Sequence, residues 1–201
     1  MNYPSFFDNA PTITLKDPLS DFLGSFTNGI VKFTYLDIVK NAGHSCPTVA
    51  GAYLSTVKAI EALYGDEMPI RGQITVALKD DVEKGVTGVI SNVITQITGA
   101  TEKTGFKGLN GNFARHTLME FNADIKSELL FRRLDTGASV SVNYDPSLVG
   151  VNPKMKELMG KMMQQIATQE EKLEFGQIWQ QRVSDIFDRV DDVVLINKWD
   201  V

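Results

Sequence analysis

The chain has 201 residues, of which 43% are hydrophobic and 22% charged, and its net charge is −5. This length supports one substantial core and excludes two large domains, and the acidic balance argues against a broad nucleic-acid surface. No apolar run approaches the ~20 residues of a membrane helix, and the first ten residues lack the pattern of a signal peptide. We therefore expect a soluble, cytoplasmic protein that does not bind nucleic acid or a membrane.

Short elements open the chain. Asp17 followed by Pro18 is typical of an N-cap and first helical residue, and Gly24 is placed to end that helix. Residues 30–35 alternate apolar and polar side chains, which predicts a strand. Residues 36–42 predict one or two helical turns, which end at the glycine that follows.

A long amphipathic helix is predicted from Pro47 to the residue before Gly65. Residues 73–78 then predict a strand. Residues 86–97 are rich in β-branched side chains, but their apolar positions keep helical spacing, so we favour a buried helix. The apolar positions that define the long helix recur every three or four residues: Val49, Tyr53, Val57, Ile60 and Tyr64.

A glycine-rich loop over residues 99–112 separates these helices from three predicted antiparallel strands at 117–122, 128–135 and 139–144. Asp-Thr-Gly at residues 135–137 is a tight-turn signal between the last two strands. Two helical apolar stripes follow, over residues 155–166 and 175–190. The sequence therefore predicts an α+β core of residues 1–150, with a mixed or antiparallel sheet packed against helices, and a helical C-terminal extension of residues 151–201.

The only cysteine and one of the two histidines fall together, as His44 and Cys46. Thiolate and imidazole are strong ligands for zinc and related metals. Cys46 directly precedes the predicted long helix, where unpaired N–H groups and the helix dipole favour a negative charge. His44 and Cys46 are therefore candidate metal ligands, and the alternative is a buried, inert cysteine with a hydrogen-bonded histidine.

His116 is the third candidate ligand and also the candidate catalytic acid–base residue, because it follows the glycine-rich loop and opens a predicted strand. Asp80 and Asp81 end another predicted strand and could supply oxygen, although such pairs are usually solvated turn residues. A closed zinc site usually takes four Cys or His ligands, and this chain has three in total. A metal here would therefore need a carboxylate, water or a partner subunit, and water in an open position is the catalytic pattern.

The glycine-rich loop is a candidate binding loop for a cofactor or an anionic substrate. It lacks the Gly-Lys-Ser/Thr ending of a P-loop. Exposed backbone N–H groups can nevertheless hold an anion, with Lys103, Lys107 and Arg115 nearby, although a plain connecting loop is the default. The candidate binding residues within it are Gly105, Gly108, Gly111 and Asn112.

Gly-His-Ser-Cys-Pro at residues 43–47 resembles the Gly-His-x-Cys-Pro segment of the FmdE-like family, which takes its name from a component of formylmethanofuran dehydrogenase. Thr-Gly-Ala-Thr at 98–101 and Gly-Leu-Asn-Gly-Asn at 108–112 are similar to that family's second motif. The match covers roughly residues 30 to 145. The second motif's cysteine is Ala100 here, and the C-terminal zinc finger of many members is absent.

The resemblance implies an α+β core, a homodimer and a metal near His44 and Cys46. It does not establish a dehydrogenase activity. We expect one divalent transition metal, zinc first, with nickel or iron as alternatives, at an open site that acts on a small anionic or C1-type substrate. The alternatives are a non-catalytic metal carrier or accessory component of a redox enzyme, and a metal-free protein that uses Cys46 as a reactive thiol. The sequence does not decide whether the chain is an enzyme.

Overall fold

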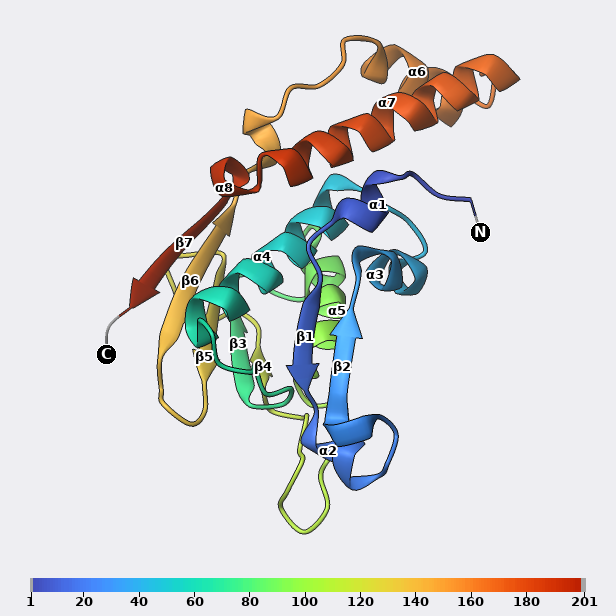
Figure 1. The fold of residues 1–201 in the computed structure, drawn as a ribbon. Helices are drawn as coiled ribbons and strands as arrows, with labels where there is room; N and C mark the ends of the chain where they lie inside the picture. Colours follow the sequence, from blue (N-terminus) through green and yellow to red (C-terminus); the bar gives the residue numbers. More distant parts are fainter. Residues whose placement is uncertain (1, 200–201) are drawn as a thin grey trace.

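Residues 2–199 are described by the computed structural model, and they form an α+β fold with a five-stranded and a two-stranded sheet (Figure 1). The helices of this part are α1 (Phe6–Asn9), α2 (Pro18–Phe22), α3 (Tyr35–Ala42), α4 (Pro47–Tyr64), α5 (Thr87–Thr98), α6 (Lys154–Met163), α7 (Gln169–Asp188) and α8 (Val190–Val193). The strands are β1 (Ile13–Lys16), β2 (Ile30–Phe33), β3 (Ile74–Leu78), β4 (Met119–Glu120), β5 (Leu129–Arg133), β6 (Ser139–Tyr144) and β7 (Val194–Trp199).

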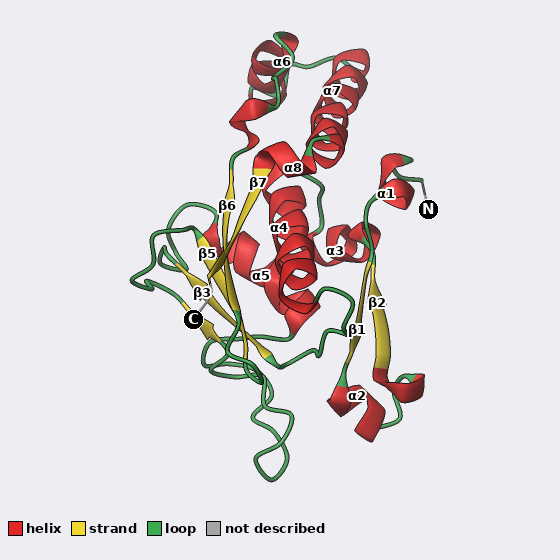
Figure 2. Cartoon of the chain, turned by 60° about the vertical axis from the view of Figure 1, so that its left-hand side comes forward, coloured by secondary structure: helices red, strands yellow, loops and turns green. Residues whose placement is uncertain are grey.

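The larger sheet has the strand order β4-β3-β5-β6-β7, in which β3 and β4 are parallel and the other pairs antiparallel. The smaller sheet pairs β1 with β2. Figure 2 shows α4 and α5 between the two sheets. The fold thus places α4 at the centre of the molecule.

Burial of α4 on nearly all sides follows from its composition. Its apolar stripe faces the sheet and α5, and small residues let other elements approach its remaining faces. Gly51 is the extreme case, because the ring of Tyr144 at the end of β6 packs directly on its Cα. The buried side chains of α4 include Val49, Tyr53, Val57 and Ile60.

Most predicted elements are confirmed, including Asp17 as a cap whose carboxylate accepts the N–H groups of Leu19 and Ser20. The helix over 86–97 is α5. The strand predicted over 117–122 is wrong in length and direction, because β4 covers only Met119–Glu120 and runs parallel to β3. Thr117 and Asn122 have positive φ angles of 60° and 55°, and this backbone ends a strand on either side.

The C-terminal segment contains the predicted helices, and it also returns to the core. α6 and α7 form a hairpin that extends away from the larger sheet (Figures 1 and 2). Strand β7, which the sequence analysis did not predict, then pairs with β6 along the edge of that sheet. Residues 1, 200 and 201, which end the two predicted segments, lie outside the described residues. Within the described residues, none of the helices combines the length and apolar character needed to cross a membrane.

Candidate functional site

The segment of residues 43–47 links α3 to α4 and carries both His44 and Cys46. Gly43 ends α3 in the left-handed conformation, with φ of 77°, as the sequence predicts for a C-cap glycine. Cys46 is the N-cap of α4, and Pro47 is its first residue. The local sequence therefore folds this segment into a sharp connection between two helix ends.

His44 is exposed, and its Nδ1 lies 3.0 Å from the carbonyl oxygen of Ala42. Because a carbonyl can only accept, this contact requires the proton on Nδ1, and in the neutral imidazole that tautomer leaves the lone pair on Nε2. Cys46 is partly buried, and its Sγ accepts the backbone N–H of Val49 at 3.5 Å. Nε2 of His44 in this tautomer and Sγ of Cys46, which has more than one lone pair, are therefore both able to donate electrons to a metal.

Side chains from α3 and α7 fix Ser45, the residue between the two candidates. Its buried hydroxyl lies 2.9 Å from the hydroxyl of Tyr35. Its carbonyl oxygen accepts the indole N–H of Trp179 at 2.9 Å and the amide N–H of Gln180 at 3.2 Å. The C-terminal helix α7 therefore holds the segment in place, so that the site belongs to the core and the C-terminal extension together.

Tyr144 fixes the other side of Cys46, because its hydroxyl donates to the carbonyl oxygen of Pro47 at 2.8 Å. Burial raises the pKa of Tyr144 far above its usual value, and burial does the same to the pKa of Tyr35. Both phenols are therefore neutral hydrogen-bonding groups at physiological pH. They orient the segment and do not act as bases.

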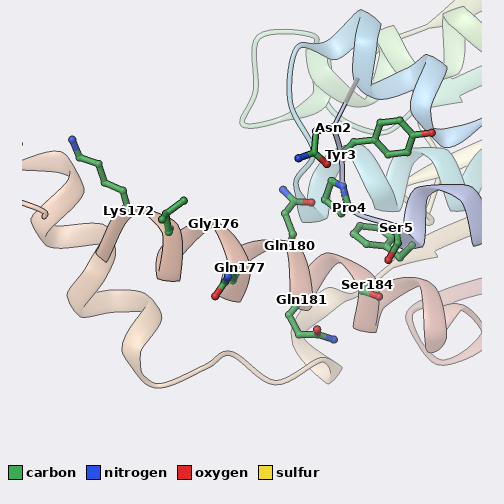
Figure 3. Close-up of a pocket in the computed structure, with 12 residues that line it drawn as sticks. Asn2, Tyr3, Pro4, Ser5, Lys172, Gly176, Gln177, Gln180, Gln181 and Ser184 are labelled. Atoms are coloured by element: carbon green, nitrogen blue, oxygen red, sulfur yellow. The ribbon is translucent and has the colours of Figure 1, made fainter. Parts of the chain in front are cut away.

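A cleft of about 750 Å³ runs between residues 2–6 and α7 (Figure 3). Amide side chains of α7, namely Gln177, Gln180 and Gln181, line one wall, and Lys172 is the only charged residue among the described residues that line the cleft. His44 and Cys46 do not line this cleft. Gln180 is the one link, because it lines the cleft and also bonds Ser45.

His116 is not brought together with His44 and Cys46 within one chain. It lies in the segment between α5 and β4, whereas Cys46 caps the N-terminal end of α4. Across residues 2–199, no three or more His, Cys, Asp or Glu side chains form a group that could hold a metal.

The two candidate aspartates have partners of their own at the end of β3. Asp80 accepts from Lys84 at 2.6 Å, and Asp81 accepts from the side-chain amide of Asn122 at 2.7 Å. These contacts are typical of a polar turn. They agree with the alternative interpretation of Asp80 and Asp81 as solvated turn residues.

Backbone geometry explains several glycines of the candidate binding loop. Leu109 and Asn112 exchange backbone hydrogen bonds of 2.9 Å, which makes the loop a tight hairpin. Gly108 has φ of 95°, and a Cβ there would lie 2.5 Å from the carbonyl oxygen of Asn112. A role for Gly105, Gly108, Gly111 and Asn112 in binding stays a prediction.

The residues that sequence reasoning missed are those that hold the segment from a distance: Tyr35, Tyr144, Trp179 and Gln180. Local patterns identify Trp179 only as part of an apolar helix stripe, and nothing in the sequence reveals its bond to a carbonyl 134 positions away. A comparison with protein-family models and with curated proteins gives no match. The resemblance described above therefore rests on the motifs themselves, and function must be argued from this site.

Proposed function

We propose that the chain is a metal-binding protein and that Nε2 of His44 and Sγ of Cys46 are two of its ligands. The observation that carries the proposal is the bond from Nδ1 of His44 to the carbonyl oxygen of Ala42. Metal-binding histidines commonly hold their second ring nitrogen in this way, which fixes the tautomer and aims the free nitrogen. Cys46 follows two residues later at a helix start, where backbone N–H groups favour a thiolate ligand.

Two ligands from one chain leave positions on the metal to be filled. Water or a small substrate would give the open pattern of catalytic sites, and a second copy of the chain would give a shared site. An imidazole and a thiolate suit zinc, and also nickel or iron. An open site is consistent with an enzyme for a small anionic or C1-type substrate; a non-catalytic metal carrier is the alternative.

Elemental analysis of protein purified without added metal tests this proposal. We expect close to one metal ion per chain, and its loss in the double variant His44→Ala with Cys46→Ser. His116→Ala is the matched control, because it removes the other imidazole of the chain. Unchanged metal content in the double variant would refute the proposal, and loss in His116→Ala alone would indicate a ligand supplied across an interface between two copies.

A reactive thiol is the second candidate function, favoured by the partial exposure of Cys46 and its contact with the N–H of Val49. A metal-free protein whose Cys46 reacts with iodoacetamide near pH 7 much faster than free cysteine would support it. Alkylation no faster than that of free cysteine, or protection of Cys46 by one equivalent of bound metal, would favour the metal site.

We also propose that two copies associate through the α6–α7 hairpin. Its apolar tip residues Met163, Ile166 and Leu173 are 78%, 63% and 61% exposed, whereas Met155 is buried. Clustered exposed apolar side chains usually mark an interface, and symmetric dimers are the commonest way to cover them. Light scattering at micromolar concentration should give twice the chain mass of 22.2 kDa, reduced to one mass by Met163→Lys with Leu173→Lys; a wild-type monomer would refute the proposal.

A further inference from the structure

A buried charge cluster joins three distant parts of the chain beside the C-terminal end of α5. The carboxylate of Asp17 accepts from Nη1 of Arg71 at 2.8 Å and from Nη2 of Arg115 at 2.6 Å. The side chains of Asp17 and Arg115 are each only 7% exposed. Burial alone would raise the pKa of Asp17, but the two guanidinium groups outweigh it and lower this pKa, so that the carboxylate is ionised. One negative and two positive charges leave the cluster with a net charge of +1.

Arg71 and Arg115 differ in how fully their N–H groups are used. Arg71 also donates to the carbonyl oxygens of Ile97 and Gln96, so each of its three nitrogens has a partner. Among the described residues, the guanidinium of Arg115 donates to Asp17 alone, through Nη2. Nε and Nη1 of Arg115 thus lack a partner, and neither belongs to the fully enclosed unpartnered atoms of the structure.

Two glycines let the Arg115 guanidinium approach the backbone this closely. A Cβ at Gly72 would lie 2.5 Å from Cζ of Arg115 and nearer still to Nη1, and a Cβ at Gly99 would lie 3.1 Å from its Cδ. Both glycines have positive φ angles, 84° and 78°. The guanidinium therefore sits in a cradle that side chains at these positions would fill.

A cavity of about 130 Å³ opens onto this cradle. Arg71, Gly72 and Arg115 line it, and so do Gln73 and Asn112, whose side chains carry amides. Within residues 2–199, no acidic residue lines it, although the whole chain carries a net charge of −5. A guanidinium with two unpartnered N–H groups is suited to a planar carboxylate or a tetrahedral phosphate. Its planar N–H groups can donate to two oxygens of the same anion at once.

We propose that this cavity binds a small oxyanion, a phosphate or a carboxylate, through the free N–H groups of Arg115, with Gln73 and Asn112 as further hydrogen-bonding groups. Asn112 belongs to the glycine-rich loop, so part of that loop would contact the anion. Neither His44 nor Cys46 lines this cavity. It does not depend on the metal proposal.

Isothermal titration of the full chain with inorganic phosphate and with acetate, against chloride at equal ionic strength, tests the proposal. We expect saturable binding of one phosphate or one acetate, and the anion that binds identifies the source. Arg115→Met should weaken binding at least tenfold and Asn112→Ala several-fold. Lys107→Ala is the matched control, since it removes a positive charge from the same loop without lining the cavity, and its binding should equal that of the wild type.

Arg115→Met could also disturb folding, so a second readout is needed on the wild-type protein. The ¹⁵N resonance of Arg115 Nε should shift as the anion is added and saturate with the titration curve. The variant His44→Ala with Cys46→Ser should bind the anion as the wild type does, which separates this proposal from the metal site. No saturable binding of either anion, or an equal loss in Lys107→Ala and Arg115→Met, would overturn the proposal.

Discussion

Replacement of Gly51 by alanine should destabilise the protein, although alanine is the better helix former. In the middle of a helix this change ordinarily stabilises by about 1 kcal/mol. At Gly51 the new Cβ would lie 2.6 Å from Cδ1 of Tyr144 and closer still to Cε1 and Cζ. The ring cannot turn aside freely, because its hydroxyl is bonded to the carbonyl oxygen of Pro47.

The magnitude follows from these opposing effects. Overpacking of this kind costs about 1–3 kcal/mol, and loss of the Tyr144 hydrogen bond adds about 1 kcal/mol. After subtraction of the helix-propensity gain, the net loss in unfolding free energy is about 1–3 kcal/mol. Gly176→Ala in α7 is the control, since a Cβ there meets nothing within 4 Å, and it should stabilise by about 0.5–1 kcal/mol.

Urea unfolding followed by circular dichroism measures both variants. Tyr144→Ala removes the obstructing ring, so in that background Gly51→Ala should become neutral or stabilising. A Gly51→Ala protein as stable as Gly176→Ala in the wild-type background, or an equal loss with and without Tyr144, would show that the ring does not limit the space at Gly51.

Two further substitutions test the turn after β5 and the hydrogen bond by which Trp179 of α7 holds Ser45. Arg133 bonds both carboxylate oxygens of Asp135 and lowers the pKa of Asp135 from 3.8 to about 2; since the folded-state pKa is the lower one, this contribution is complete above about pH 4 and is lost as pH falls toward 2. The stability difference between wild type and Asp135→Asn, measured by thermal unfolding, should therefore shrink from pH 5 to pH 2, and a constant difference would contradict this account. Trp179→Phe keeps the aromatic packing and removes one bond to Ser45, so we expect about 1 kcal/mol less stability and roughly tenfold weaker metal binding in a competition titration; an unchanged metal affinity would show that α7 does not position the site.

Local signals were enough to predict most elements of the chain. The cap at Asp17, the glycine ends at Gly43 and Gly65, and the helical spacing of α4 and α5 all depend on neighbours within a few residues. A local signal also predicted that a helix begins directly after Cys46, because proline has a fixed φ angle that suits the first helical position, here Pro47. The α+β class followed from these elements together.

Tertiary structure decided what these local elements meet. Sequence cannot show that β4 runs parallel to β3, because that direction depends on the path of the chain after α5. It also cannot show that Trp179 holds Ser45, or that Arg115 shares Asp17 with Arg71 across 98 positions of sequence. Such contacts are formed by side chains that burial brings together, and burial depends on the whole core. For this reason the candidate ligands could be named from sequence, whereas the separation of His116 from them and the cavity at Arg115 appear only in the folded chain.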